Sequence, residues 1–509
     1  MRRIAALISI ALALIALAPA QSLEGRVEEL VLDNGMTFLL MNRGDAPVFS
    51  GVIRWNVGSS DEPVGQTGIA HMFEHMAFKG TSTIGTSDWE AERPVLEALN
   101  EAGTALARER LRGEDADPER LAALEEAYEA AVEAHRQFVV KDELDMIYSA
   151  AGAVGLNAWT SRDFTNYHVS LPANALELWC LCESARIRDG VLREFYSERD
   201  VVYEERRMRT DTDPTGALIE DFLAMAFLAH PYGDPTIGWP SDIENLTTAD
   251  AEAFYAQHYV PANAVAAIVG NFDMEEARRL IHEYFDPIPA AEPPPGVTTV
   301  EPPQRGERRV EIEWDAEPIV VIGYHKPNPP DHTDAVFDVI HSILSRGRTS
   351  RLYTRMIKEE QIAVEADAFS FPGDRFPNLS AFFLVPRAPH TPEDLEAALF
   401  EELERLATEP VSERELQRVI NQLDADFLRG LRSNLGMANQ LAYWQLIGDD
   451  WRWTERWVEE IRSVTAEQIM AVAAEYYTEQ NRTVGILRTR VEDELPPAEE
   501  TESAVEVGA

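Results

Sequence analysis

Cysteine is nearly absent from this sequence, since only Cys180 and Cys182 occur among its 509 residues, in the stretch "LWCLCES". If that stretch is helical, residues i and i+2 point to different sides of the helix, which makes a disulfide between them awkward. We therefore interpret both cysteines as small buried apolar side chains rather than as a disulfide or a metal site.

Basic residues are also scarce. The chain has 45 Lys and Arg residues against 89 Asp and Glu residues, which gives a formal net charge of −44 at pH 7. Such an acidic surface repels nucleic acids and anionic membranes, so the composition argues against both as partners. It would favour cationic ligands, but we attribute the charge to general solubility or salt tolerance.

Long apolar runs are missing after the first residues, so we expect no integral membrane segment in the mature protein. The start, "MRRIAALISIALALIALAPAQS", has the layout of a secretory signal: two arginines, an apolar stretch from Ile4 to Leu17, and an A-x-A cleavage site that ends at Ala20. A membrane anchor is the alternative, but the apolar stretch is short for a span of about 20 residues. We predict that residues 1–20 are a removable signal peptide and that the protein is periplasmic, or secreted, in a bacterium.

A chain of 509 residues is too long for one ordinary core, so two or more domains are expected. Strand-like and helix-like segments follow in a similar order before and after a Pro-rich stretch at 287–308, which we interpret as a linker. We predict an α+β fold with two similar halves, 21–286 and 309–490, each with a mostly antiparallel sheet packed by helices. The acidic tail at 491–509 is poor in core residues and is expected to be disordered.

One stretch of the first half has a different character. From Ser87 to Asp145 (87–145) the chain is rich in Ala, Glu, Leu and Arg, and it is interrupted by "RGEDADPER". This pattern predicts an inserted hairpin of two long amphipathic helices, capped near Ser87 and again near Asp115 or Asp117. Such helices can protrude from the rest of the first half.

The stretch "GIAHMFEHMAFKGT" contains the candidate metal-binding residues. His71, Glu74 and His75 are spaced i, i+3 and i+4, so in a helix they share one face. Two imidazoles on one face can bind one metal ion, and a zinc hydrolase needs this geometry together with a third ligand from elsewhere. The alternative is a helix that merely carries surface or hydrogen-bonded histidines.

Three motifs together resemble the inverted-zincin metallopeptidases of the pitrilysin, insulysin and mitochondrial processing peptidase family (family M16). They are "HMFEHMAFKGT", "NAWTSRDFTNY" and "SERDVVYEERRM", and the similarity in order and pattern covers nearly the whole mature chain. The resemblance implies that His71, His75 and a distal glutamate bind one Zn²⁺ per chain. It also implies that Glu74 is the general base that activates a zinc-bound water for hydrolysis of a peptide bond.

The distal ligand of the family lies in a helix with the pattern E-x-x-x-V-x-x-E. Here Glu205 matches the ligand and Glu198 matches the first acid of the pattern. Glu198 stands two helical turns earlier on the same face, where it could orient a ligand or tune the base. Glu204 neighbours Glu205 but points away by about a quarter turn, so we favour Glu205.

In the family a substrate peptide lies along an edge strand beside the zinc, and Asn157 and Ala158 match that strand. The alternative for Asn157 is a turn residue. Tyr167 and Arg162 are expected to be structural, and His168 to be a packed or surface residue rather than a ligand.

The second half departs from the family pattern. Family members commonly carry an Arg and a Tyr, seven residues apart, that hold substrate, and the corresponding positions here are Ile357 and Val364. The closed chamber of the family is generally built from four such halves, so this chain supplies two. The resemblance therefore implies a dimer, and we predict a heterodimer with a related exported subunit that lacks H-x-x-E-H and carries the Arg/Tyr pair.

The leading hypothesis is an exported zinc endopeptidase or oligopeptidase acting on peptides or unfolded polypeptides. One alternative is a subunit that keeps the family fold but serves in assembly or peptide binding. Another is an unrelated helical protein in which H-x-x-E-H arose by chance, which would need no distal acids at the family spacing.

Overall fold

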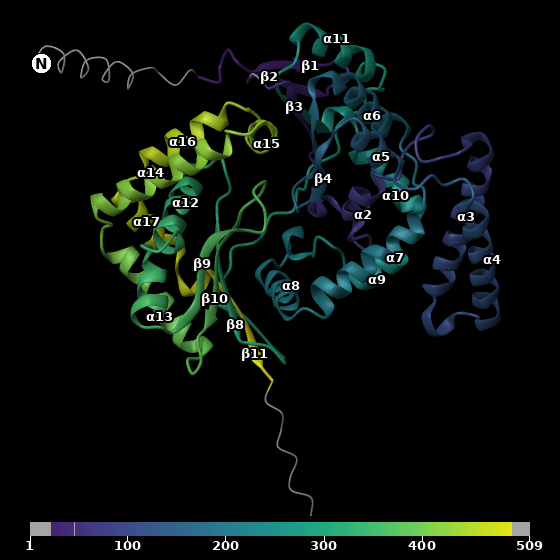
Figure 1. Cartoon of the computed structure of the whole chain (residues 1–509). Coiled ribbons are helices and arrows are strands. Elements are labelled where there is room, and N and C mark those ends of the chain that lie inside the picture. The colour runs from purple at the N-terminus through teal and green to yellow at the C-terminus, as the bar shows by residue number, and fades with distance from the viewer. Residues whose placement is uncertain (1–21, 45, 491–509) are drawn as a thin grey trace, which may run out of the picture.

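The computed structural model describes residues 22–44 and 46–490, and its elements form two sheets with many helices (Figure 1). The predicted signal peptide and acidic tail lie outside the described residues. The strands of the first sheet are β1 (Glu28–Val31), β2 (Thr37–Asn42), β3 (Val48–Trp55), β4 (Val154–Thr160), β5 (Thr165–Pro172) and β6 (Ala264–Gly270). Their order is β1-β2-β6-β3-β5-β4, and every neighbouring pair is antiparallel except β2 and β6.

The second sheet repeats this arrangement with one strand fewer. Its strands are β7 (Arg308–Trp314), β8 (Ile319–Lys326), β9 (Ala363–Phe371), β10 (Asn378–Pro386) and β11 (Arg482–Thr489). Their order is β7-β11-β8-β10-β9, and here too only one neighbouring pair, β7 and β11, is parallel. The prediction of an α+β fold with two similar, mostly antiparallel halves is confirmed.

Most helices of each half lie on one face of its own sheet, and α8 and α15 are exceptions described below. Those of the first half are α2 (Ile69–Met76), α3 (Trp89–Arg110), α4 (Pro118–Arg136), α5 (Glu143–Ala150), α6 (Leu176–Asp189), α7 (Phe195–Arg206), α8 (Pro214–Ala226), α9 (Pro240–Asn245), α10 (Thr248–His258) and α11 (Met274–Phe285). Those of the second half are α12 (His332–Ser345), α13 (Pro392–Thr408), α14 (Glu413–Gly430), α15 (Asn434–Ile447), α16 (Trp453–Ser463) and α17 (Ala466–Tyr476).

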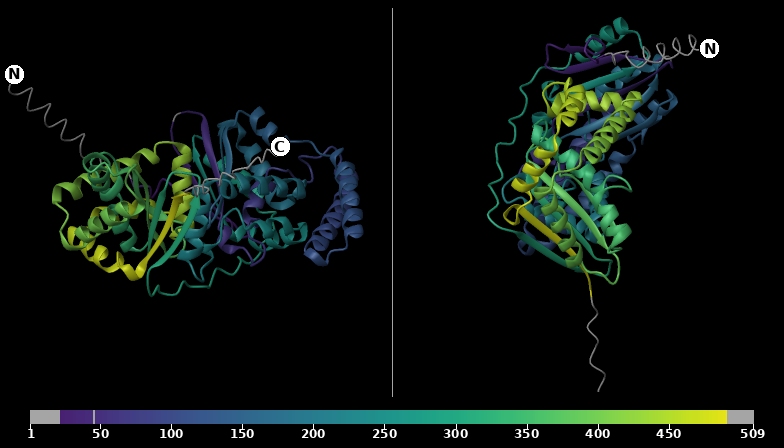
Figure 2. Two further views of the ribbon diagram at one scale, coloured as in Figure 1. Left: turned by 90° about the horizontal axis from the view of Figure 1, so that it is seen from below. Right: turned by 90° about the vertical axis from the view of Figure 1, so that its left-hand side faces the viewer.

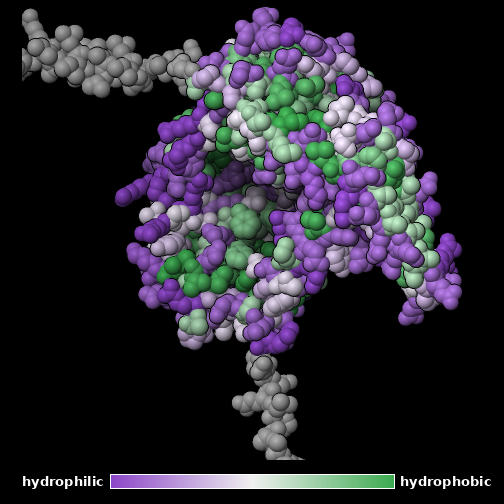
Figure 3. Space-filling view, turned by 45° about the vertical axis from the view of Figure 1, so that its right-hand side comes forward, coloured by the Kyte–Doolittle hydropathy of each residue, from purple (hydrophilic) through white to green (hydrophobic). Residues whose placement is uncertain are grey.

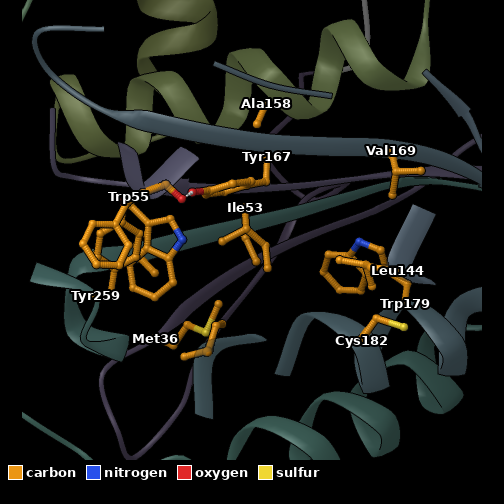
Figure 4. Close-up of a cluster of buried hydrophobic side chains, with 14 of the residues drawn as sticks. Met36, Ile53, Trp55, Leu144, Ala158, Tyr167, Val169, Trp179, Cys182 and Tyr259 are labelled. Atoms are coloured by element: carbon orange, nitrogen blue, oxygen red, sulfur yellow. Dashed lines mark hydrogen bonds between the residues drawn. The ribbon is translucent and has the colours of Figure 1, made fainter. Parts of the chain in front are cut away.

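The core of the first half lies between its sheet and these helices, and Figure 4 shows part of it. Trp179 is packed edge-to-face against Phe49 at a ring-centroid distance of 6.5 Å. Cys180 and Cys182 are both free and almost completely buried in this core, which confirms their interpretation as apolar packing residues. Burial raises the pKa of both thiols, so neither is a ready nucleophile.

The two halves exchange a helix. α15, from the second half, packs on β3 and β6, where Met437 and Leu441 join Val52 and Val265 in one buried cluster. In return, α8 of the first half packs on β7 and β11 of the second sheet through Phe222 and other apolar residues. Each sheet therefore has one face covered by a helix from the other half, and neither half alone would cover both faces of its sheet.

Direct polar contacts join the halves beside these helices. The loop between β9 and β10 places Arg375 against Asp61, with Nη2 and Oδ1 2.8 Å apart. The backbone N–H of Asp374 donates to Asp163 Oδ2 at 2.6 Å. A hollow remains between the two halves on the face that Figure 3 shows.

Within 87–145, the stretch predicted to be an inserted hairpin, α3 and α4 pack against each other and stand out at one side of the molecule (Figures 1 and 2). The side chains of Asp88 and Asp117 cap the two helices. The hairpin is anchored as well as protruding, because Glu92 of α3 binds both His135 of α4 and the buried Arg193 that precedes α7. Glu92 and Arg193 stabilise each other, since an unpaired buried charge is costly.

Candidate metal centre

The helix α2 begins at a conformation that suits glycine. Gly68 has a φ of 90°, and a Cβ there would lie 2.6 Å from the carbonyl oxygen of Ile237. The carboxylate of Glu62 accepts hydrogen bonds from the backbone N–H groups of Gly68 and Ala70 at 2.9 and 2.8 Å, which satisfies free donors of the first turn. Met72 and Phe73 are buried in the core of the first half. The helix is therefore fixed in position on one side, and its other side carries the motif.

His71, His75 and Glu205 come together between α2 and α7. Glu205 Oε2 lies 3.8 Å from His71 Nε2 and 3.5 Å from His75 Nε2. One ligand atom from each of these three residues can be chosen so that all lie within 4.8 Å of one another. Two imidazole nitrogens and one carboxylate oxygen converging on one point form a donor set that fits Zn²⁺ and leaves a coordination position open.

Glu198 lies behind this cluster, on the same helix as Glu205. Its Oε2 is 3.3 Å from His75 Nδ1, the ring nitrogen that does not face Glu205. Its other oxygen pairs with Lys79, which also lies 3.7 Å from Glu194. A carboxylate in this place fixes the ring orientation and the tautomer of a metal-binding histidine.

The two histidines differ in their electrostatic surroundings. Burial, helped by the nearby His75, lowers the pKa of His71 to about 4. Burial also acts to lower the pKa of His75, but the hydrogen bonds with Glu198 and Glu205 outweigh it and raise that pKa to about 9. Glu198 and Glu205 thus favour a positive charge at His75. A bound metal cation can supply that charge in place of the proton on the imidazole.

Glu74 faces the same cleft and is not part of the three-residue cluster. Burial raises its pKa, while hydrogen bonding with Thr160 acts in the opposite direction. A carboxylate with a raised pKa is a better proton acceptor at neutral pH, so Glu74 has the character of a general base.

Asn157 and Ala158 lie in β4, the edge strand of the first sheet, and line the cleft with the motif residues. Asn157 is within the strand, opposite His168 of β5, and is not part of a turn. The free edge of β4 can pair with an extended peptide, whose bonds would then run past the histidines. The cleft has a volume of about 790 Å³, which is enough for several residues of a peptide.

The residues expected to be structural have internal partners. Tyr167 is buried and donates to the carbonyl oxygen of Phe73 at 3.3 Å, and Arg162 donates to that of Tyr232 at 3.1 Å. His168 is half-buried on β5, where Nδ1 lies 3.3 Å from the Asn166 side-chain nitrogen.

The positions of the missing Arg/Tyr pair lie in the second half. Ile357 belongs to the helical turn Tyr353–Glu359, and Val364 is exposed on β9. Among the described residues, neither of them lines the metal cleft.

Two basic residues at the site had no role in the sequence interpretation. Lys79 binds Glu198, and Arg209, which lines the cleft, lies 2.8 Å from Glu205 Oε1. Each stands four residues after a proposed ligand, His75 or Glu205. The i, i+4 spacing is the signal that could have pointed to both.

Family profiles and curated proteins match this chain. Residues 50–107 match the family profile "Insulinase (Peptidase family M16)", and residues 245–423 match "Peptidase M16 inactive domain". The zinc protease PqqE of Helicobacter pylori is 26% identical over 92% of this chain and 94% of its own. An uncharacterised zinc protease of Mycobacterium leprae is 26% identical over 82% of both chains.

Solved structures have the same fold. A protease from Helicobacter pylori superposes with a TM-score of 0.76 at 24% identity, covering 91% of this chain and 99% of that one. A peptidase M16 inactive domain from Pseudomonas fluorescens gives a TM-score of 0.72 at 15% identity, covering 91% and 98%. The chain belongs to peptidase family M16, and its curated relatives are named zinc proteases.

Proposed function

We propose that this protein is an exported zinc metallopeptidase whose catalytic centre lies in the first half, 21–286. The observation that carries the proposal is the convergence of His71, His75 and Glu205 beside Glu74 in a cleft bordered by the free edge of β4. A subunit that only binds or assembles would need a fold and a groove, but not this donor set beside a base.

The residues would divide the work as follows. His71, His75 and Glu205 would hold Zn²⁺, which when bound polarises a peptide carbonyl and acidifies a water molecule. Glu74 accepts a proton from the attacking water and passes it to the leaving amine. The backbone of Asn157 and Ala158 hydrogen-bonds the extended substrate and keeps the scissile bond beside Glu74.

Export is part of the proposal. A signal peptide of residues 1–20 would direct the chain to the periplasm or the medium. Within the described residues, no helix is long and apolar enough to cross a membrane. The structural relative PqqL of Escherichia coli is described as a periplasmic protease.

We also propose that the chain works as a dimer, with 309–490 as a non-catalytic half. The match to PqqL covers 91% of this chain but 48% of that one, so PqqL is about two such units long. A single chain of the present length would supply half of such an assembly. The absent Arg/Tyr pair favours a heterodimer whose second subunit carries it.

The decisive experiment is a digest of a peptide library by the purified protein, with metal content measured on the same sample. Cleavage that stops after chelation and returns when Zn²⁺ is added supports the proposal. Stoichiometric zinc without any cleavage, alone or with a related subunit, would favour the alternative of a binding or assembly subunit.

A further inference from the structure

Arg209 stands in the metal cleft beside one of the proposed ligands. It belongs to the helical turn Arg207–Asp211 between α7 and α8, and it lines the cleft together with His71, Glu74 and Glu205. Its Nη2 lies 2.8 Å from Glu205 Oε1, yet its side chain is 70% exposed. The guanidinium is therefore open to a molecule that enters the cleft.

The two oxygens of Glu205 have different partners. Oε2 faces Nε2 of His71 and Nε2 of His75 at 3.8 and 3.5 Å, whereas Oε1 pairs with Arg209. With Zn²⁺ held at Oε2, the negative charge of this carboxylate is shared between the ion and Arg209, so it neutralises the guanidinium only in part. A guanidinium also carries five N–H donors, and one ion pair leaves several of them free for another acceptor.

Among the described residues that line the cleft, the second arginine and one of the acids already have internal partners. Arg162 donates to the backbone carbonyl oxygens of Tyr232 and Asp234, at 3.1 Å each. Glu220 accepts hydrogen bonds from both Nη atoms of Arg206, at 2.7 and 2.8 Å. Within the described part of the chain, the cleft therefore presents one arginine that a substrate can reach.

The backbone of Arg209 is held by the first turn of α8. A Cβ at Gly216 would lie only 1.9 Å from the carbonyl oxygen of Arg209, so the helix packs directly on the turn. Asp213 caps the same helix, because its side chain accepts a hydrogen bond from the Gly216 N–H at 2.6 Å. The side chain of Arg209 thus projects from a fixed position.

We propose that Arg209 is a specificity-determining residue that binds a carboxylate of the substrate close to the scissile bond. This inference rests on the proposed peptidase function, and it names the class of substrate. The carboxylate belongs to an Asp or Glu side chain or to the C-terminus of the peptide, and the planar fork of the guanidinium matches either one.

The position of this carboxylate on the substrate follows from the geometry. Only the carboxylate group of Glu205 stands between Arg209 and the two proposed zinc histidines. An extended peptide rises about 3.3 Å per residue. The substrate carboxylate therefore lies within about two residues of the scissile bond.

The preference is local. The net charge of −44 repels acidic peptides at long range, but at physiological salt exposed charges more than about 8 Å apart are largely screened from each other. Arg209 therefore favours a carboxylate at one position of the peptide, and not acid-rich peptides as a class.

Peptide binding to the zinc-loaded, full-length Glu74→Gln variant tests this assignment without any need for cleavage. The first pair of probes consists of coumarin-labelled, C-terminally amidated decapeptides of Ala, Leu and Ser that differ in one central residue, Glu or Gln. The second pair is a pentapeptide of Ala, Leu and Ser with a free C-terminal carboxylate, and its amide. In at least one pair, fluorescence anisotropy should give the carboxylate peptide a Kd about threefold lower or more, because a partly exposed charge pair adds about that much.

Substitutions made in the same Glu74→Gln background locate the preference. Arg209→Gln should abolish it, so that the charged and uncharged probes bind equally, while the zinc content measured by mass spectrometry stays unchanged. Arg209→Lys should keep part of it, because the charge remains but the planar fork is lost. Arg207→Gln is the matched control, because Arg207 belongs to the same turn but pairs with Glu204, and it should keep the whole preference.

The contrary results separate this inference from the proposed function. If peptides bind but neither carboxylate probe binds better than its uncharged counterpart, or if Arg209→Gln keeps the preference, the role of Arg209 is wrong and the peptidase proposal stands. Loss of zinc in Arg209→Gln, with equal weakening of all probes, would show that the arginine only holds Glu205. Failure of every probe to bind the zinc-loaded protein would contradict the peptide site itself, and with it both proposals.

Discussion

His75 Nδ1 lies 3.3 Å from Glu198 Oε2, while Nε2 of the same ring lies 3.5 Å from Glu205 Oε2. One imidazole is thus held between two carboxylates of a single helix, α7, that stand seven residues apart. Because two helical turns separate them on one face, one carboxylate can bind a metal while the other orients the ring.

We expect Glu198→Gln and Lys79→Met each to lower zinc affinity about 10- to 100-fold. Glu198 contacts His75 and Lys79 contacts Glu198, so each substitution removes an interaction that keeps the His75 ring in position. Competition with a chromophoric chelator measures this affinity. Lys79→Arg should restore most of it, and Lys358→Met, at an exposed lysine of the second half, serves as the control. Wild-type affinity in Lys79→Met would show that the lysine has no part in positioning the histidine.

The proposed ligands predict the metal content. His71→Ala and Glu205→Gln should lose most of the zinc, about one ion per chain in the wild type, as measured by mass spectrometry of the purified protein. Glu204→Gln is the matched control, because Glu204 is the adjacent acid and binds Arg207 instead. Full occupancy in both ligand variants would show that the assignment is wrong.

Glu74→Gln should keep the fold and the metal but lose peptide hydrolysis by at least about 10²-fold, because the proton acceptor is gone while the ligands remain. The rate on a peptide found in the library digest, together with the zinc content, checks this. Near-normal turnover in Glu74→Gln would place the base elsewhere.

Buried histidines should lower the free energy of unfolding as the pH falls. Burial, helped by the charge of Lys326, lowers the pKa of His341 to about 3, and its Nε2 lies 2.8 Å from Ser380 Oγ. Since the unfolded chain takes up this proton near pH 6.5, stability is fully present above that pH and is lost as the pH falls toward 3. Between pH 7 and pH 5 the loss from His341 is about 2 kcal/mol.

The difference in urea midpoints between pH 7 and pH 5 measures this loss. His341→Gln cannot titrate, so its difference should be smaller than that of the wild type, whatever its stability at pH 7. His282→Gln is the control, because that side chain is 50% exposed on α11 and should leave the difference unchanged. An unaltered difference in His341→Gln would contradict the prediction.

The heterodimer proposal predicts weak activity of the isolated chain. We expect the purified protein to bind zinc but to cleave peptides slowly, and to gain activity when a related exported subunit with the Arg/Tyr pair is added. Light scattering gives the mass of each species. Full activity of the isolated chain as a homodimer would contradict the need for a second subunit, because Ile357 and Val364 cannot make the contacts of Arg and Tyr.

Much of the local structure follows from the sequence itself. The spacing of His71, Glu74 and His75 in an amphipathic stretch requires only the 3.6-residue period of a helix to place them on one face. Asn34-Gly35 marks the turn between β1 and β2, and the structure has Gly35 at a φ of 91°, a value that favours glycine. Glu205 lies 130 residues from His75, so composition and period alone could not select it, and the resemblance to a family was needed.

The tertiary structure decided which surfaces meet. The sequences of α8 and α15 show that an apolar face must be covered, but not that each would cover the sheet of the other half. Nor could the sequence show that Glu92 of the hairpin would bind both His135 and Arg193, or that α3 would form one wall of a cavity behind α2. Periodicity is a property of one segment, whereas a buried charge cluster and a cavity depend on segments that are brought together only when the whole chain packs.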